Sequence, residues 1–280
     1  MPPEGARYDG PVIDTHVHLQ SGDTPVLGTR SHRPNDYLRA TRNIHLRAAC
    51  ALAMAPRGNR EETRRRNDWV LSLSRRPKSP FLPFCSVHPL DGAFALGEID
   101  RVARLGARGL KLHPNTQQFD VADPKVRSIV ERATEKGLPV LFDAYSPFDP
   151  AQPGKFVQLA LSVPTARLIL AHAHGPNFPQ LLVYPILSLY PWWPRQVWID
   201  VSMIGELLAP SPFAEQLAWV LRKVGTDRLL FGSDYPLAPD PQKSLLSLRR
   251  LGFKYKEIRA IAYDNAVALL GLPKVDERQG

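Results

Sequence analysis

Cysteine is scarce in this chain of 280 residues, which has only Cys50 and Cys85, each inside an apolar stretch. Two such residues do not make a disulfide framework, and we expect both to be buried thiols of a reduced cytoplasmic protein. The first ten residues lack the apolar core of a signal peptide, and no run of about 18 apolar residues occurs. We therefore expect a soluble protein with no membrane partner.

Motifs of nucleotide binding and covalent catalysis are also absent. No G-x-G-x-x-G follows the first predicted strand, which leaves a Rossmann dinucleotide site without support. No G-x-S-x-G is present, so the serine nucleophile of an α/β-hydrolase is not supported either. Neither cysteine lies beside an activating base. Covalent catalysis is therefore not expected.

Acidic residues number 27 against 36 lysines and arginines, and the formal net charge is +9. A basic chain can bind a polyanion such as nucleic acid. The densest basic cluster, residues 57–68, nevertheless includes three acids, as a solvated helix face does. Basic and aromatic residues are not interleaved in the way that single-stranded nucleic acid requires. We expect a small-molecule partner and no nucleic acid.

Apolar stretches of strand length recur along the chain, each with turn or breaker residues near its ends. From the fourth onward their starts are separated by 31, 29, 30 and 31 residues, which is the length of a βα unit. The eight predicted strands span residues 11–18, 45–54, 81–89, 107–114, 138–145, 167–175, 197–203 and 228–236.

Segments with helical periodicity lie between these strands. Residues 123–137 place their apolar side chains on one face, with Pro124 near the start and Gly137 at the end. Residues 96–107 and 211–225 have the same pattern. Short apolar strands that alternate with amphipathic helices indicate a parallel sheet covered by helices.

The number of these units decides between two α/β architectures. Eight units in about 250 residues match a closed (β/α)8 TIM barrel better than an open doubly wound sheet, which stays the alternative. No linker or repeat divides the chain. We expect a single domain over residues 1–280.

One segment departs from this regularity. Residues 175–196 hold five prolines and several aromatic residues. The simplest interpretation is a barrel helix flanked by packed loops. A lid or a subunit contact is the alternative, because exposed Trp192 and Trp193 would be unfavourable on a bare surface. The oligomeric state stays open, and a homodimer is one of the expected states.

Two histidines stand two residues apart on the first predicted strand, so His16 and His18 project from the same face. They lie at its C-terminal end, where the active sites of barrels are built. Adjacent neutral imidazoles are a natural start for a divalent-metal site. Histidines and acids also stand near the C-terminal ends of most other strands, and a closed barrel would bring them into one ring: His88, His113, Asp143, His172, His174, Asp200 and Asp234.

Four motifs, taken in order, resemble the amidohydrolase superfamily. They are VIDTHVH at 12–18, GLKLHP at 109–114, AHAHG at 171–175 and FGSDYP at 231–236. Within the superfamily, the chain is similar to the amidohydrolase-related branch that contains 2-amino-3-carboxymuconate semialdehyde decarboxylase, other aromatic-acid decarboxylases and lactone hydrolases. Residues 263–272, YDNAVALLGL, resemble the closing helix of that branch, so the resemblance spans almost the whole chain.

The resemblance implies a divalent metal, usually zinc, held by His16, His18 and Asp234. It also implies that Asp234 takes a proton from the water that the metal activates, and that His172 polarises the substrate or helps to activate that water. Zinc can lower the pKa of a bound water from about 15.7 to about 7. A carboxylate beside that water can then act as a base.

One position departs from the pattern of the branch. A metal-binding histidine is typical at the end of the fifth strand, in a phrase like PVLIHTG, whereas this chain reads PVLFDAYSP and has Asp143 there. Because a carboxylate can bind zinc, we expect Asp143 to be a further ligand. A site with two carboxylates would also suit Mn²⁺. A degenerate site that binds metal weakly or not at all is the alternative.

Lys111 and His113 lie two residues apart on the predicted fourth strand and should face the barrel interior. We expect Lys111 to bind the carboxylate of an anionic substrate. The alternatives are a lysine that neutralises Asp143 and a carbamylated lysine that bridges two metals, as the resemblance implies for some superfamily members. His113 is expected to contact substrate or to support the ligands.

The expected function is that of a metal-dependent hydrolase that acts on a small carboxylate-bearing lactone, amide or ester. Non-oxidative decarboxylation of an aromatic or unsaturated acid at the same residues is the nearest alternative. A catalytically silent barrel with a degenerate metal site is the second alternative. Of the remaining strand-end residues, His88 and Asp200 are expected either to line the pocket or to cap a loop, and His174 is expected at its rim.

Overall fold

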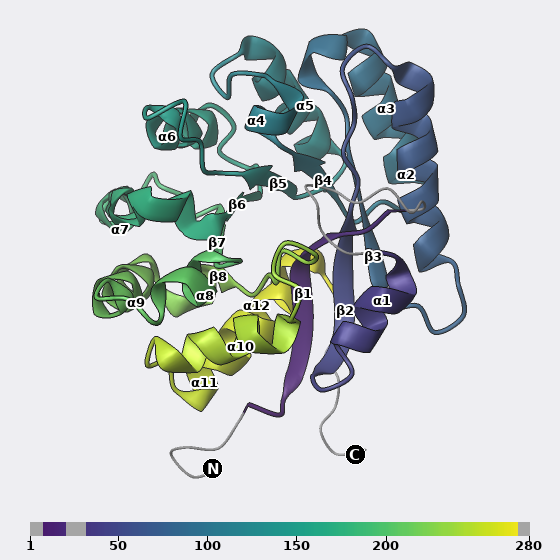
Figure 1. The fold of residues 1–280 in the computed structure, drawn as a ribbon. Coiled ribbons are helices and arrows are strands. Elements are labelled where there is room, and N and C mark those ends of the chain that lie inside the picture. The colour runs from purple at the N-terminus through teal and green to yellow at the C-terminus, as the bar shows by residue number, and fades with distance from the viewer. Residues whose placement is uncertain (1–7, 21–31, 274–280) are drawn as a thin grey trace.

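Eight parallel strands follow one another in chain order around a single sheet (Figure 1). The structure is a computed structural model that describes residues 8–20 and 32–273; residues 1–7, part of the segment without a signal-peptide core, lie outside the described residues. The strands are β1 (Pro11–His18), β2 (His45–Leu52), β3 (Phe81–Cys85), β4 (Gly109–Leu112), β5 (Val140–Asp143), β6 (Leu168–Ala171), β7 (Val197–Asp200) and β8 (Leu229–Leu230).

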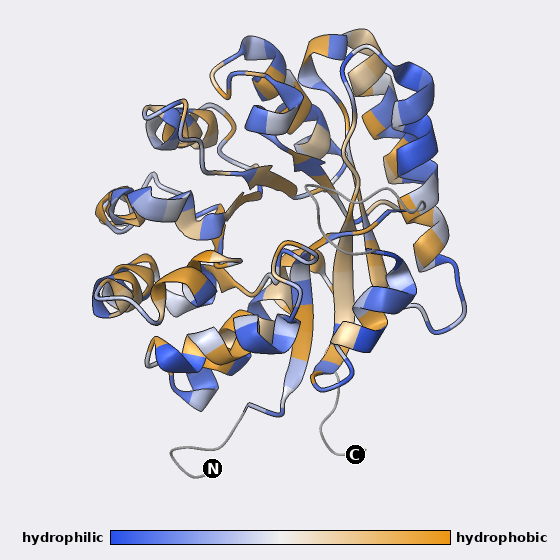
Figure 2. Cartoon of the chain, in the orientation of Figure 1, coloured by the Kyte–Doolittle hydropathy of each residue, from blue (hydrophilic) through white to orange (hydrophobic). Residues whose placement is uncertain are grey.

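Helices alternate with the strands and surround the sheet (Figure 1). The longer ones are α2 (Arg60–Ser74), α3 (Ala93–Arg104), α5 (Pro124–Glu135), α6 (Gln152–Ser162), α9 (Ala214–Val224) and α10 (Pro241–Arg250). The shorter ones are α1 (Pro34–Ala40), α4 (Pro114–Gln117), α7 (Val183–Leu187), α8 (Ile204–Leu208), α11 (Tyr255–Arg259) and α12 (Asn265–Leu270). Figure 2 shows hydrophobic strands at the centre and hydrophilic outer faces on helices such as α2.

The segment that follows β8 brings the sheet back to β1. The backbone N–H of Thr15 donates to the carbonyl of Phe231 at 2.9 Å, and that of His18 donates to Tyr235 at 2.8 Å. The N–H of Asp234 donates to the carbonyl of His16 at 2.9 Å. These bonds join the last strand to the first, so the fold is the predicted (β/α)8 TIM barrel and the open-sheet alternative is wrong.

The three predicted helices are present, with shifted ends. At α5, the Asp123 carboxylate accepts a hydrogen bond from the N–H of Lys125 at 2.8 Å, and the chain leaves the helix at Gly137, whose φ is +68°. Helix α3 begins at Ala93, three residues before the predicted start. Helix α9 begins at Ala214 because residues 211–213 form a turn in which the Ser211 hydroxyl accepts from the N–H of Phe213.

The lower opening of the barrel is closed by the C-terminal helical segment. Tyr263, Ala266 and Leu269 pack in one buried cluster with Ile13 of β1 and Leu230 of β8, which lie inside the barrel. The polar residues gather at the other end of the barrel, where the C-terminal ends of the strands lie. The closing helix that the resemblance implied covers the opposite face.

The proline-rich segment 175–196 contains a helix, α7, as the simpler interpretation predicts, but the loop after it is only partly packed, with Leu189 80% exposed. Trp193 is buried and stacks on Tyr184 with ring centroids 6.2 Å apart. Trp192 is 58% exposed and stacks on Tyr190. The premise of the alternative, that both tryptophans are exposed, therefore does not hold for Trp193, which packs in the same buried cluster as Tyr184 of α7. The homodimer stays a prediction.

Both cysteines, Cys50 and Cys85, are buried and free, as predicted. None of the helices in the described ranges combines the length and the apolar character needed to cross a membrane. The cytoplasmic location stays a prediction.

Candidate metal centre and active site

His16 and His18 lie on one face at the end of β1, as the alternation of side chains in a strand requires. Their Nε2 atoms are 3.1 Å apart. The His16 side chain is fully buried, whereas that of His18 is 22% exposed. Burial lowers the pKa of both imidazoles well below the ordinary value, so both rings are neutral at pH 7. Neutral imidazoles are the form that binds a metal.

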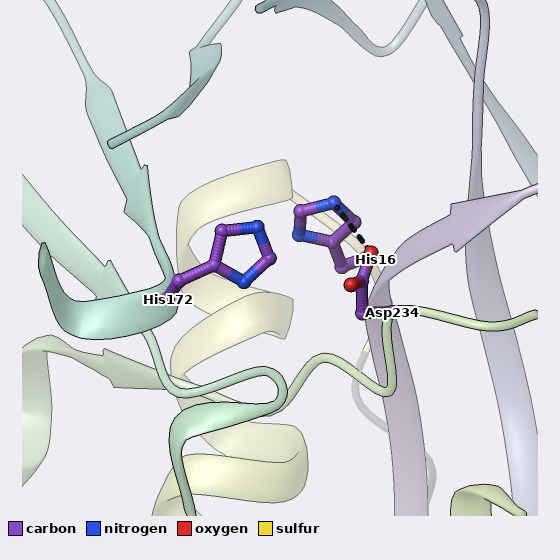
Figure 3. Close-up of side chains that lie close together, drawn as sticks. All are labelled: His16, His172 and Asp234. Carbon is purple, nitrogen blue, oxygen red and sulfur yellow. Dashed lines mark ion pairs between the residues drawn. The ribbon is translucent and has the colours of Figure 1, made fainter. Parts of the chain in front are cut away.

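Asp234 reaches the same point from the segment after β8 (Figure 3). Its Oδ1 lies 3.3 Å from His16 Nε2 and 3.6 Å from His18 Nε2. The residue has a positive φ of 61°, which is uncommon outside glycine, and its backbone N–H donates to the carbonyl of His16. Burial raises the pKa of its carboxyl to about 6.

Asp200, at the end of β7, fixes the orientation of the His16 ring. The His16 Nδ1 lies 2.8 Å from Asp200 Oδ2, and both side chains are completely buried. An ionised carboxylate only accepts, so Nδ1 carries the proton and the lone pair of Nε2 points toward His18 and Asp234. A carboxylate behind a metal-binding histidine is a recurring arrangement in metalloproteins.

The three converging atoms fit a divalent ion. Two imidazole nitrogens and one carboxylate oxygen are a common donor set for zinc and its neighbours. Ligand atoms about 2.0–2.1 Å from a tetrahedral ion lie about 3.3 Å from one another, and the separations here are 3.1, 3.3 and 3.6 Å. His16, His18 and Asp234 could therefore hold such an ion.

Lys111 lies beside this cluster, fully buried, with its Nζ 3.2 Å from His16 Nε2. Burial lowers the pKa of its ammonium group, while Asp143 and Asp234 oppose this effect. The sequence therefore placed Lys111 correctly on the inner face of β4. A substrate group that binds the Lys111 amine would therefore lie next to the candidate metal ligands.

His172 follows β6 and approaches the cluster from the other side (Figure 3). One nitrogen of His172 lies within 4.8 Å of donor atoms of both His16 and Asp234. Its Nε2 is 3.1 Å from Asp143 Oδ2, and its Nδ1 is 3.0 Å from Ser202 Oγ. Burial opposes the charged form, but the hydrogen bond and the charge of Asp143 raise the pKa of His172 to about 9. The ring is an imidazolium at pH 7.

Asp143 stands at the end of β5, between two histidines. Its Oδ2 is 3.1 Å from His172 Nε2 and 3.4 Å from His113 Nε2. Burial alone would raise its pKa, but the bond and charge of His172 hold the pKa well below its usual range. Burial lowers the pKa of His113 to about 4, so that ring is neutral. Asp143 thus contacts His172, which lies next to the cluster, and His113 lies beside Asp143.

Two outer residues belong to the fold and not to the cluster. His88 caps a short helix, where its Nδ1 accepts from the N–H of Leu90, and its Nε2 lies 2.6 Å from the carbonyl of Gln117. His174 is 1% exposed, so its expected place at the rim is wrong. Residues 172–174 all have positive φ, and this turn directs His174 inward, where Nδ1 contacts the carbonyl of Ala144.

Two residues of the site were not expected from the sequence. Ser202 Oγ lies between His172 Nδ1 and His16 Nδ1, at 3.0 and 3.3 Å. Asp14 is fully buried and accepts from the Tyr37 hydroxyl at 2.9 Å and from the N–H of Ser233 at 2.9 Å, which ties β1 to the loop of Asp234. Their signals were present: Ser202 stands two residues after Asp200, and Asp14 is an acid within an apolar strand.

The amidohydrolase family model matches residues 13–272. The chain belongs to the amidohydrolase family. This confirms the resemblance on which the expected ligands rest, and it places the chain in a family of enzymes. The sequence matches none of the curated proteins with which it was compared.

Solved structures with the same fold include enzymes of two reaction types. 5-Carboxyvanillate decarboxylase from Sphingomonas paucimobilis is 15% identical, with a TM-score of 0.71 over 95% of this chain and 100% of that one. A probable 2-pyrone-4,6-dicarboxylic acid hydrolase from Acinetobacter baumannii, with citric acid bound, is 15% identical, with a TM-score of 0.65 over 93% and 99%. 5-Carboxyvanillate decarboxylase from Novosphingobium aromaticivorans, complexed with manganese and a nitrobenzoic acid, is 15% identical, with a TM-score of 0.69 over 93% and 96%.

Proposed function

We propose that this amidohydrolase is a metal-dependent hydrolase of a small carboxylate-bearing lactone, amide or ester. The observation that carries the proposal is the convergence of His16 Nε2, His18 Nε2 and Asp234 Oδ1 within 3.6 Å of one another at the C-terminal face of the barrel. Zinc is the first candidate for the ion, and manganese, which one structural neighbour holds, is the second. A divalent ion there would supply Lewis acidity, which polarises a substrate oxygen and lowers the pKa of water.

Asp234 is the general base in this proposal. Its pKa of about 6 leaves the carboxyl group ionised at pH 7, yet basic enough to accept a proton from water. The water oxygen attacks the carbonyl carbon, the bond to the leaving oxygen or nitrogen breaks, and the proton on Asp234 passes to the leaving group. The buried position of Asp234 excludes other water from this transfer.

His172 and Lys111 act on the negative charge of the substrate. The imidazolium of His172, next to the cluster, stabilises the charge that develops on the carbonyl oxygen. Lys111 Nζ lies beside His16 and binds the carboxylate that marks the substrate as anionic. The structural neighbours act on small carboxylates or hold one, which supports an anionic substrate.

Decarboxylation of an aromatic or unsaturated acid is the second candidate, because two of the three structural neighbours described above are decarboxylases. In this reaction His172 and Lys111 hold the carboxylate. The carbon–carbon bond breaks, CO₂ leaves, and Asp234 in its protonated form delivers a proton to the ring carbon. The same residues serve both reactions, so the substrate decides between them.

The test is a paired assay of the metal-loaded protein. Lactones of dicarboxylic acids are followed for ring opening, and hydroxybenzoates with a second carboxylate are followed for CO₂ release. Turnover that requires metal and is lost in Asp234→Asn supports the proposed site, and the active substrate class selects the reaction. Full activity in a metal-free preparation, or in Asp234→Asn, would overturn the mechanism. A protein that binds neither Zn²⁺ nor Mn²⁺ in calorimetry would favour the silent barrel.

A further inference from the structure

Asp143 stands in the position where the fifth strand of this branch was expected to carry a metal-binding histidine. Its nearest polar partners in the structure are two histidines of the neighbouring strand ends, with Oδ2 at 3.1 Å from His172 Nε2 and 3.4 Å from His113 Nε2. Asp143 is 8% exposed. The contact with His172 Nε2 is a hydrogen bond, whereas the contact with His113 Nε2 is a close approach without hydrogen-bond geometry.

Both nitrogens of His172 are engaged as well. Nε2 faces the carboxylate of Asp143, which only accepts, so this nitrogen carries a proton. Nδ1 lies 3.0 Å from the hydroxyl and 3.3 Å from the carbonyl of Ser202, and the carbonyl again only accepts. With a proton on each nitrogen, the ring has no lone pair to give to an ion. His172 is therefore near the metal ligands without being one.

The other partner, His113, is held in one tautomer by the start of α4. The N–H of Thr116 donates to His113 Nδ1 at 3.4 Å, so Nδ1 is the acceptor and the ring proton is on Nε2. His113 Nε2 lies 3.4 Å from Asp143 Oδ2, close enough for the two groups to interact electrostatically. Asp143, at the end of β5, thus meets residues that follow both β4 and β6, through a close approach to His113 and a hydrogen bond to His172.

The cluster of possible ligands does not contain Asp143. Within the described parts of the chain, the metal-capable atoms of three or more histidines, cysteines or acids come together in a single group, formed by His16, His172 and Asp234. His18 joins it through Nε2, at 3.1 Å from His16 and 3.6 Å from Asp234. The only member of this group to which Asp143 is hydrogen-bonded in the described structure is His172, whose ring centroid lies 5.0 Å from that of His16.

We propose that Asp143 is a positioning residue for His172 and not a metal ligand. The inference rests on the proposed function and deepens it, because it replaces the expected fourth ligand by a donor that faces the substrate. The carboxylate holds the His172 ring in one orientation beside His16 and Asp234. The ion would keep its remaining positions open for substrate and water, and the protonated ring would bind the substrate oxygen.

Metal binding separates a ligand from a positioning residue. Mn²⁺ alone is titrated into metal-free wild-type protein, Asp143→Asn, Asp143→Glu and Asp234→Asn by calorimetry. Asp143→Asn is isosteric and keeps an acceptor for His172, and circular dichroism confirms that each variant is folded. We expect the dissociation constant of Asp143→Asn to stay within about 3-fold of wild type, and that of Asp234→Asn to rise by at least about 100-fold.

A double-mutant cycle tests the connection to His172. The cycle uses Asp143→Asn, His172→Gln and the double variant, with whichever of the two candidate substrate classes the enzyme turns over. We expect each single change to lower kcat/KM by about 100-fold, and the double variant to be no worse than His172→Gln alone. If the two residues act as a unit, the second substitution causes no further loss of kcat/KM. If they act independently, the two losses multiply to about 10,000-fold. Asp143→Glu should recover part of the activity.

Each outcome counts for or against the inference. A rise in the Mn²⁺ dissociation constant of Asp143→Asn that matches Asp234→Asn would make Asp143 a ligand and overturn it. Multiplicative losses in the cycle would overturn it as well, because Asp143 would then act independently of His172. Failure of the proposed function looks different: wild-type protein itself would bind neither Mn²⁺ nor Zn²⁺, and the inference would fall with it.

Discussion

The Nδ1 atom of His16 lies 2.8 Å from Oδ2 of Asp200, and both side chains are completely inaccessible to solvent. This contact decides which nitrogen of His16 is free to bind a metal. Because Asp200 comes from β7 and His16 from β1, it also joins two strands on either side of the closing seam. The orientation of the His16 ring and the region where the barrel closes therefore involve the same pair.

We predict that Asp200→Asn weakens metal binding by about 10- to 100-fold. The amide group can donate to His16 Nδ1, which would move the ring proton to Nε2 and remove the lone pair from the cluster. Calorimetric titration with Zn²⁺ and Mn²⁺ measures the change. Asp91→Asn, whose carboxylate accepts from the N–H of Gly58 at a distance from the site, is the control. Unchanged affinity in Asp200→Asn would show that Asp200 does not set the tautomer.

Lys111 is the second residue whose replacement should change metal affinity, but in the opposite direction. Its Nζ is 3.2 Å from His16 Nε2, so an ion on that nitrogen would lie beside a group that can carry a positive charge. We predict that Lys111→Met tightens metal binding by at least about tenfold, because charge repulsion is removed. The same variant should raise the KM of an anionic substrate.

The control for Lys111→Met is Lys125→Met at the exposed start of α5. It should alter neither the dissociation constant of Mn²⁺ nor the KM. Weaker metal binding in Lys111→Met would contradict the prediction and would mean that the lysine holds the His16 ring in place.

Local rules were sufficient for the parts of the site that stand on strands. The two-residue period of β1 placed His16 and His18 on one face, and apolar stretches of strand length, regularly spaced from the fourth onward, located all eight strands. The rules failed where the chain leaves a strand. After β6, three residues with positive φ reverse the direction of the side chains, so His174 enters the core although His172 reaches the site.

The partners of a side chain could not be predicted from its own strand. Asp143 was correctly placed at the end of β5, but its contacts with His113 and His172 depend on the packing of three strand ends. Strand β8 has only two residues, and the barrel is closed by the backbone of the segment that follows it. Neither feature leaves a periodic pattern in the sequence, so neither could be predicted without the three-dimensional structure of the barrel.

Gly232 lies in the segment that closes the barrel, against Asp200 and His16. A Cβ atom on it would lie 2.5 Å from Asp200 Oδ1 and 2.7 Å from the Cβ of His16. We predict that Gly232→Ala destabilises the protein by about 1–3 kcal/mol, as overpacking of a rigid core does, and also weakens metal binding. Urea unfolding and Mn²⁺ calorimetry measure the two effects.

A matched glycine provides the control for Gly232→Ala. Gly97 lies on the exposed face of α3, and a Cβ there would meet nothing within 4 Å. Gly97→Ala should stabilise the protein by about 0.5–1 kcal/mol because alanine favours a helix. Equal behaviour of the two variants would show that the space around Gly232 can adjust, which would count against a rigid seam.

His174 should make the protein sensitive to acid. Burial lowers its pKa to about 4, below the value of 6.5 that applies to the unfolded chain. Between these two values the unfolded chain takes up a proton that the folded protein does not, so the stability is full above pH 6.5 and falls as the pH falls to 4. The loss from this group amounts to about 3 kcal/mol at its limit.

We predict that His174→Asn removes this part of the acid sensitivity of the metal-free protein. The asparagine amide can still donate to the carbonyl of Ala144, which His174 Nδ1 contacts at 2.8 Å, but it does not titrate. Free energies of unfolding measured in urea from pH 7 to pH 4 should therefore fall less steeply in the variant. Phe156→Leu removes the ring that stacks on His174 and keeps the histidine, so it should lower the stability by a similar amount at each pH. If the stability of His174→Asn has the same pH dependence as that of wild type, His174 takes up its proton equally in the folded and the unfolded protein, and its burial does not lower the stability in acid.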